Sequence, residues 1–362
     1  MRLATFNIEN LFERPRAMNL ATWDAGQPAI DAAAQLNKLF NQATYSPPDK
    51  QRMLDLLAAN GLLATRPSGT FLELRKIRGQ LFSVPKNSPA TIVAKGRADW
   101  VGWVDLKKEP VDDEAISNTA RIIADVDADV LVLCEVENRP SLQQFTDQFL
   151  GPLLKKQNYG WNMVIDGNDQ RGIDVAILSR YPLSHMLSHI TDMDGTSKVF
   201  GRDCPEYVVE LPGDVPLLVL PNHFASKGSD FTGKRRKQQS KRVRQIYDER
   251  RLHFDHILVA GDLNDHPKGG SLDRLLDSDL TDAMAMDAYD GLPGTYAHAN
   301  PSQKFDYLLM SPALADHVTA VDVDRRGFYA PTKWKSLPSI TKETKDRYQA
   351  SDHHCLWADL DW

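Results

Sequence analysis

Residues 258–265 read LVAGDLND. The apolar run 257–260 stops at Gly261, and Asp262, Leu263 and Asn264 follow it. Because side chains alternate along an extended chain, Asp262 and Asn264 lie on one side and Leu263 lies on the other. A carboxylate and a carboxamide at the end of an apolar strand suit either a polar turn or a binding site. These eight residues alone leave both interpretations open.

The same arrangement recurs along the chain, where an apolar run ends near an Asn, Asp, Glu or His. Strands are predicted at 3–8, 129–136, 174–179, 216–224, 256–263, 305–310 and 354–360. The polar residues near six strand ends are Asn7, Glu135, Asn222, His223, Asp262, Asn264, Asp306, Asp352 and His353. One such residue is more often a turn or cap residue, but chance rarely produces six cases in one chain. Carboxylate and amide oxygens suit Mg²⁺ or Mn²⁺, and the absence of clustered Cys and His argues against structural zinc.

The chain is otherwise organised as alternating strands and helices. Apolar periodicity predicts helices at 113–126, 141–156 and 234–251. The region 13–110 puts nearly a hundred residues between the first strand and the next core strand, which is too long for a loop. We therefore expect a single domain over 1–362 with an inserted elaboration at about 13–110. An independent subdomain is the alternative, which the thin apolar content of the region disfavours.

Composition limits the class of protein. A hydrophobic content of 42% and a charged content of 25% are typical of a globular protein. The net charge of −6 argues against a wholly basic nucleic-acid coat but leaves room for a local basic patch. Three scattered cysteines, Cys134, Cys204 and Cys355, do not suit a disulfide framework or a zinc site. Neither a leader nor a membrane-spanning run is visible, so we expect a cytoplasmic protein without membrane insertion, and no protein partner is evident.

The ordered motifs resemble those of the endonuclease/exonuclease/phosphatase superfamily. They are NIEN at 7–10, LCEVEN at 133–138, NHFASKG at 222–228, GDLN at 261–264, FDYLL at 305–309 and SDHH at 351–354. The NHFASKG form is similar to bacterial nucleases of this group, and the resemblance covers 1–12 and about 111–362. It implies a DNase-like α/β fold, a four-layer two-sheet sandwich with the site at one end. It also implies a divalent-metal-dependent phosphoester hydrolase.

The chemistry also constrains the metal ligands. A phosphodiester repels hydroxide, so its hydrolysis needs a cation on the phosphoryl oxygens and a positioned, deprotonated water. Glu135 is the best candidate ligand, because a buried strand leads straight into it and a buried carboxylate needs a cationic partner. Asn7 and Asp352 are its expected companions, around one Mg²⁺ (or Mn²⁺) ion or two.

The resemblance implies roles for the other residues. Asp262 would activate or orient the water, and Asn264 would donate to the phosphate. His353 would contact the phosphate and shuttle a proton, with Asp306 holding its tautomer. His223 would be a second imidazole on the leaving-group side, and Asn222 would donate to a phosphate oxygen.

Three residues are weaker candidates for substrate contact. Asp174 could orient His223 or form an ion pair with Arg171, and Lys227 follows His223 closely. Residues 226–251 hold ten basic and three acidic residues, which suits either a solvated helix or a surface that attracts a polyanion.

The sequence thus predicts a nuclease that cleaves phosphodiester bonds of DNA or RNA. The alternative is a phosphatase or phosphodiesterase for a small molecule or lipid head group. An inactive binding protein is disfavoured because the motif set is complete. The choice between DNA and RNA, and between endo and exo cleavage, stays open at this point.

Overall fold

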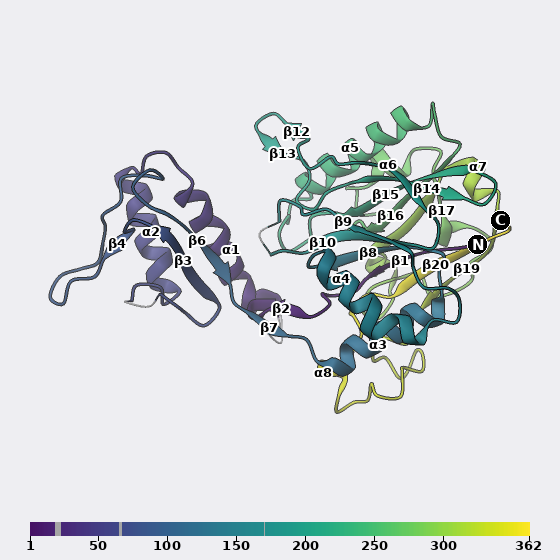
Figure 1. The fold of residues 1–362 in the computed structure, drawn as a ribbon, viewed down its shortest axis with the longest axis horizontal. Coiled ribbons are helices and arrows are strands. Elements are labelled where there is room, and N and C mark those ends of the chain that lie inside the picture. Colours follow the sequence, from purple (N-terminus) through teal and green to yellow (C-terminus); the bar gives the residue numbers. More distant parts are fainter. Residues whose placement is uncertain (19–22, 65–66, 170) are drawn as a thin grey trace. The chain divides into compact units, whose positions relative to one another are not determined.

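The computed structural model describes residues 1–18, 23–64, 67–169 and 171–362. They form two compact units, one of Met1–Phe12 with Val111–Trp362 and one of Glu13–Pro110. The larger unit contains two six-stranded sheets, and helices flank them (Figure 1). It carries all of the candidate site residues named above.

The order of strands in the first sheet is β19 (Val318–Asp324), β20 (Cys355–Leu360), β1 (Arg2–Asn7), β8 (Val130–Val136), β10 (Asp174–Ser179) and β9 (Trp161–Val164). In the second sheet it is β11 (Leu183–Leu187), β14 (Glu206–Leu211), β15 (Val215–His223), β16 (His256–Asp262), β18 (Asp306–Met310) and β17 (Thr281–Asp282). All seven predicted strands are present within one or two residues of their expected bounds.

Apolar side chains from both sheets fill the space between them, for example Leu3 and Val132 against Val219 and Ala260. Helices α3 (Asp113–Val126) and α4 (Arg139–Phe145) pack on the outer face of the first sheet. Helix α5 (Lys234–Arg250) packs on the outer face of the second sheet through Val243, Ile246 and Tyr247. The predicted two-sheet α/β sandwich is therefore confirmed, with helix, sheet, sheet and helix as its four layers.

Strand directions bring the polar strand ends to one edge of the sandwich. Strand β1 runs parallel to β8, and β15 runs parallel to β16, so these four strands end together in pairs. Strand β18 is antiparallel to β16 and begins where β16 ends, with Asp306 opposite Asp262. Gly261 permits this ending, because its φ is +130° and a Cβ there would lie 1.9 Å from the carbonyl oxygen of Asn222.

The smaller unit has a hydrophobic core of its own. Its elements are β2 (Glu13–Pro15), a 3₁₀ turn (Arg16–Met18), α1 (Trp23–Phe40), α2 (Pro47–Ala59), β3 (Leu72–Arg78), β4 (Phe82–Ser83), β5 (Thr91–Ile92), β6 (Val101–Leu106) and β7 (Lys108–Pro110). Phe40, Met53, Leu72, Trp100 and Val104 are buried together in that core. The apolar residues are thin in the sequence but gather in one cluster. That this unit is an elaboration of a single domain stays a prediction.

Several elements differ from the expectation or were not predicted. The helix expected at 141–156 is α4 followed by a π turn (Thr146–Leu150) and a 3₁₀ turn (Gly151–Leu153). The Thr146 hydroxyl donates to the Leu142 carbonyl oxygen at 2.8 Å. A side-chain bond of this kind, to the carbonyl four residues earlier, often bends a helix. Strands β9, β11, β14, β17 and β19 were not predicted.

The remaining short elements of the larger unit are β12 (Met193–Asp194), β13 (Ser197–Lys198), α6 (Asp273–Leu276), α7 (Pro312–Ala315), α8 (Lys345–Tyr348) and two 3₁₀ turns (Ala283–Ala285 and Pro301–Gln303). Within the described ranges, the structure contains no helix whose length and apolar character would let it cross a membrane. All three cysteines are free and buried.

Candidate active site

Glu135 reaches the site because β8 is interrupted by a bulge. In the pairing of β10 with β8, Asp174 faces Val136 and Val175 faces Cys134, so Glu135 is the extra residue. Its φ of +68° lies in the left-handed region, which is costly for a residue with a side chain. A bulge re-aims a side chain. Here it turns the Glu135 carboxylate toward Asn7 and His223, away from the outer face that Leu133 and Val136 share.

Two asparagines flank the Glu135 carboxylate. The Nδ2 atom of Asn7 lies 3.4 Å from Oε1, and the Nδ2 atom of Asn10 lies 3.5 Å from Oε2. Both hydrogen bonds are long, and the carboxylate is buried. Among the described residues, the Oδ1 atom of Asn10 is buried without a hydrogen-bond partner. A buried carboxylate beside an unused amide oxygen fits a hard divalent cation, which prefers oxygen ligands.

Asp262 is held rigidly at the end of β16. Its Oδ1 atom accepts from the Asn264 backbone N–H at 2.8 Å, and its Oδ2 atom accepts from Asn264 Nδ2 and Asn7 Nδ2, each at 3.1 Å. Burial raises the pKa of the Asp262 carboxyl, and the nearby Asp306 adds to that rise. Asp262 is therefore a better proton acceptor than an exposed aspartate. Asn264 also donates to the Phe224 carbonyl oxygen at 3.0 Å, so in this arrangement its amide orients Asp262.

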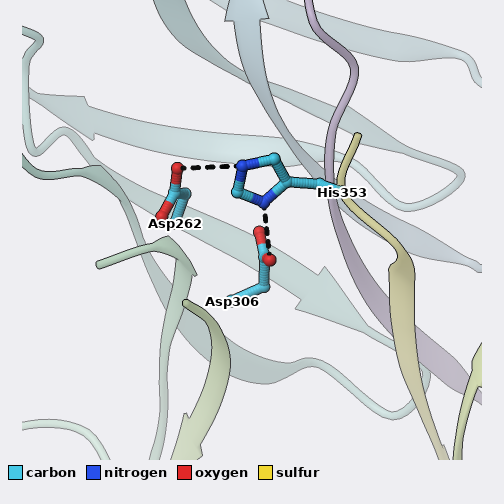
Figure 2. Close-up of side chains that lie close together, drawn as sticks. All are labelled: Asp262, Asp306 and His353. Carbon is cyan, nitrogen blue, oxygen red and sulfur yellow. Dashed lines mark hydrogen bonds and ion pairs between the residues drawn. The ribbon is translucent and has the colours of Figure 1, made fainter. Parts of the chain in front are cut away.

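His353 lies between two carboxylates (Figure 2). Its Nδ1 atom hydrogen-bonds to Asp306 Oδ2 at 2.8 Å, and its Nε2 atom lies 3.7 Å from Asp262 Oδ2. Burial opposes the charge on the imidazole, but Asp306 and Asp262 together raise the pKa of His353 well above its ordinary value. The imidazole is therefore protonated on both nitrogens and positively charged at neutral pH, and Asp306 fixes the orientation of the ring.

Asp262, Asp306 and His353 also have the spacing of a metal site, since one ligand atom from each lies within 4.8 Å of the others. However, both imidazole nitrogens already face carboxylate oxygens. A protonated nitrogen cannot ligate a cation, so the geometry favours a proton relay for these three residues. The oxygen atoms around Glu135 are the better candidate ligands.

His223 approaches Asp262 from the other side. Its Nε2 atom lies 3.4 Å from Asp262 Oδ2 and 3.9 Å from Glu135 Oε1. Burial, together with the cations of Arg202 and Arg171, lowers the pKa of His223 well below its ordinary value. The two histidines at this site therefore differ in charge at neutral pH, with His223 neutral and His353 positively charged.

Asn222 is not part of this group. It precedes His223 in β15, and adjacent residues of a strand point to opposite faces. Its Nδ2 atom donates to the Leu220 carbonyl oxygen at 3.0 Å, and the outer-face residues Leu218 and Leu220 belong to the cluster that packs against α5. The structure thus separates Asn222 from the other predicted residues of its motif.

Asp352 borders the site beside His353. Its backbone N–H donates to Glu9 Oε2 at 3.2 Å, and the hydroxyl of Tyr296 hydrogen-bonds to it. The Tyr296 ring meets the His353 ring edge-on, with 4.9 Å between centroids. Of the three residues predicted to bind metal, Asn7 and Glu135 contact each other directly. Asp352 contacts Glu9 and Tyr296, and its carbonyl oxygen accepts from the Ala297 backbone N–H at 2.7 Å.

Asp174 and Arg171 do not form the ion pair considered from the sequence. Arg171 pairs with Asp169, with 2.6 Å between Nη2 and Oδ2. Asp174 Oδ1 accepts from the Gly167 backbone N–H at 2.8 Å, and burial raises the pKa of Asp174 to about 7. Lys227 lies at the edge of the site, where its Nζ atom is 3.0 Å from Asp265 Oδ1.

The sequence argument missed Arg202 and Tyr296. Arg202 is buried, its Nε atom lies 3.1 Å from Asp169 Oδ2, and its Nη1 atom donates to the Phe224 carbonyl oxygen. Its charge acts on His223. Arg202 lies in a loop without any apolar run, so strand patterns could not find it. Tyr296 belongs to a short bridge with His353 that leaves no repeating pattern.

The sequence matches the Endonuclease/Exonuclease/phosphatase family over residues 110–353. The chain belongs to this family. Members of the Endonuclease/Exonuclease/phosphatase family are hydrolases that act on phosphoesters and depend on divalent metals. No protein of curated function matches the sequence.

Several solved structures are similar to this chain at low sequence identity. The mannosyl-6-phosphatase of Bacteroides thetaiotaomicron is 16% identical, with a TM-score of 0.50, over 68% of this chain and 90% of that one. An endonuclease/exonuclease/phosphatase protein from Bacteroides vulgatus is 15% identical, with a TM-score of 0.48, over 68% and 90%. Truncated TDP2 of Caenorhabditis elegans is 18% identical, with a TM-score of 0.45, over 67% and 88%.

Proposed function

We propose that this protein is a metal-dependent nuclease, which hydrolyses phosphodiester bonds of DNA or RNA with Mg²⁺ or Mn²⁺. One observation carries the hydrolytic part of the proposal. The Oδ2 atom of Asp262 faces the Nε2 atoms of both His223 and His353, at 3.4 and 3.7 Å. A buried carboxylate between a neutral and a protonated imidazole is an arrangement suited to moving protons at a phosphoester.

The cation would be held by oxygen atoms of Glu135, Asn7 and Asn10, with Asp352 as a further candidate. When bound, it would supply positive charge to the phosphoryl oxygens. Asp262 accepts the proton of the attacking water, because its raised pKa and fixed orientation favour that role.

The two histidines act on opposite sides of the phosphoryl group. His353 holds its proton at Nε2 and donates a charged hydrogen bond to a phosphoryl oxygen, while Asp306 keeps the ring in place. His223, which is neutral, lies on the other side of Asp262 and would act on the side of the leaving oxygen.

The polymer substrate is supported by the charge on α5. Lys234, Arg235, Lys237 and Lys241 are exposed there, and a group of exposed cations attracts a polyanion. A small soluble phosphate ester, one alternative substrate, needs no such surface.

The test is a substrate panel with Mg²⁺ or Mn²⁺, in which the His353→Ala variant controls for contaminating nucleases. The panel contains supercoiled plasmid, linear duplex, single-stranded DNA, RNA, an aryl phosphomonoester and an aryl phosphodiester. We expect cleavage of a nucleic acid and of the aryl phosphodiester. Activity on the monoester alone would replace the nuclease with a phosphatase, and inactivity on every substrate would remove the hydrolase proposal.

A further inference from the structure

Phe231 is the most exposed large hydrophobic side chain among the described residues, at 95% of its full accessible surface. A single exposed apolar residue often has no special role. Phe231 differs because backbone hydrogen bonds hold the chain on both sides of it. The Asp230 backbone N–H donates to the Ser226 carbonyl oxygen at 2.9 Å, and the Gly233 N–H donates to the Asp230 carbonyl oxygen at 3.0 Å.

Asp230 anchors this loop, defined as residues 226–233, to the helix that follows. Its carboxylate is buried and accepts from the Arg236 backbone N–H at 2.9 Å. The Arg236 guanidinium in turn donates to the Ala225 carbonyl oxygen at 3.1 Å. Because Asp230 points inward and is held there, the backbone at the next residue, Phe231, has a defined position and its side chain faces outward.

The residues that lead into this loop lie beside the candidate active site. Phe224 accepts at its carbonyl oxygen from Asn264, one of the residues that hold Asp262. Lys227 places its Nζ atom 4.9 Å from the centroid of the Phe305 ring. That ring lies 6.4 Å from the ring of His353. A strand bound at the catalytic residues is therefore close to the start of loop 226–233.

Exposed cations follow Phe231 directly in α5. Lys234, Arg235, Lys237 and Lys241 are exposed, and no ion pair within 4.0 Å involves them in the part of the chain that the structure describes. The cations farther along α5 are neutralised instead, since Arg242 pairs with Asp192, Arg244 with Asp248 and Arg250 with Glu206. Unpaired positive charge is thus concentrated in the half of α5 next to Phe231.

We propose that Phe231 stacks on an unpaired base of a nucleic-acid substrate, while Lys227, Lys234, Arg235 and Lys237 contact its phosphates. This inference rests on the proposed nuclease function and names its substrate class as a strand with accessible bases. An aromatic face beside a row of cations is the combination that binds single strands, because bases stack on the ring and phosphates follow the charge. Stacking depends on the base plane, so it tolerates different sequences.

The experiment measures binding of a fluorescent single-stranded oligonucleotide to the full chain. EDTA is present so that metal-dependent hydrolysis does not consume the oligonucleotide. Phe231→Ala should weaken binding about 5- to 160-fold, the range expected for one lost base–aromatic contact. Phe231→Trp should keep parent affinity. Leu252→Ala is the matched control, because Leu252 is another exposed apolar side chain, at 77% of its full surface, just beyond α5. It should bind as the parent does.

A second oligonucleotide separates stacking from charge. If its bases are replaced by abasic sugars, the parent and Phe231→Ala should bind it equally, since only phosphate contacts remain. Equal binding of the normal strand by the parent and Phe231→Ala would overturn the proposal. So would weaker binding of Phe231→Ala to anionic lipid vesicles with unchanged oligonucleotide binding, which would assign Phe231 to a membrane surface.

Hydrolysis of an aryl phosphodiester distinguishes this inference from the proposed function. That substrate has no base to stack, so Phe231→Ala should hydrolyse it at the parent rate. A parent that hydrolyses the aryl ester but does not bind the oligonucleotide would overturn the inference and leave phosphoester hydrolysis standing. A parent that binds the oligonucleotide through Phe231 but hydrolyses no substrate would support the stacking inference and overturn the proposed hydrolase function.

Discussion

Asp306 and His353 are joined by a hydrogen bond of 2.8 Å between Oδ2 and Nδ1, which leaves Nε2 as the imidazole nitrogen that faces Asp262. Removing the charge of Asp306 should allow the other tautomer and lower the pKa of His353. We expect Asp306→Asn to reduce kcat by about 10²–10⁴, a range typical for the loss of general acid–base catalysis. The measurement is steady-state hydrolysis of an aryl phosphodiester.

The neighbouring carboxylate gives a second test of the relay. Asp262→Asn should lower kcat by a similar factor of about 10²–10⁴ while leaving the far-ultraviolet circular dichroism unchanged. The amide keeps the shape of the carboxylate but cannot accept the water proton. Near-parent turnover in this variant would exclude Asp262 as the base.

Metal removal should abolish hydrolysis and also lower the melting temperature. A cation bound only by the folded state stabilises it by about 2.7 kcal/mol at a hundredfold excess over its Kd. We therefore expect Mg²⁺ or Mn²⁺ to raise the Tm of the EDTA-treated parent and to restore activity. Glu135→Gln should lose most of that rise, because it removes the negative charge of the carboxylate that Asn7 and Asn10 flank. Full activity after exhaustive chelation would contradict the metal assignment.

The exposed cations of α5 should control the salt dependence of nucleic-acid binding. Arg236 is excluded from this test, because it is buried and its Nη1 atom lies 3.8 Å from Asp230. Replacing Lys234, Arg235 and Lys237 together with Gln should reduce the slope of log K against log salt by roughly 0.7–0.9 for each lost phosphate contact. The control replaces three exposed lysines elsewhere, Lys155, Lys335 and Lys342, with Gln. Equal slopes in the two triple variants would show that the exposed cations of α5 do not contact the nucleic acid.

His189 should make stability depend on pH, away from the active site. Its Nε2 and Nδ1 atoms lie 2.8 Å from Glu206 and 3.0 Å from Asp192. Burial lowers the pKa of His189, but the two carboxylates outweigh it and leave the pKa raised. A raised pKa adds stability that is complete below the unfolded value of about 6.5 and is lost as the pH rises through the folded value.

We therefore expect His189→Asn to lower the free energy of unfolding by about 1–2 kcal/mol at pH 5.5 and by less at pH 9. Thermal or urea unfolding at both values measures the difference. The exposed His185→Asn variant, on the edge strand β11, is the control and should show no such dependence. A larger loss at pH 9 than at pH 5.5 would reverse the assigned sign.

The core strands could be predicted from the sequence because their apolar runs are continuous. Strand β10, for example, reads DVAILS and is buried throughout. Strand β19 was not predicted, because it has no continuous apolar run. Its residues alternate between apolar and polar instead, which is the pattern of a half-buried edge strand. Helix α4 gives way to a π turn where the Thr146 hydroxyl donates to the Leu142 carbonyl oxygen, a local side-chain bond that apolar periodicity does not report.

The candidate site could be predicted in its residue types more than in its geometry. Alternation already separates Asn222 from His223, although the motif names both. The orientation of Glu135 depends on a bulge in β8, and no residue type announces it. Arg202 acts through its charge on His223 from a loop that is distant in sequence, so only the folded chain reveals the contact.

The smaller unit leaves and rejoins the larger one at a single point. The Val111 backbone N–H donates to the Phe12 carbonyl oxygen at 2.9 Å, and β2 pairs with β7 immediately beyond, Glu13 opposite Pro110. Every strand of the two six-stranded sheets lies outside Glu13–Pro110, so a short turn from Phe12 to Val111 would be enough to join the two parts of the chain that build the sandwich.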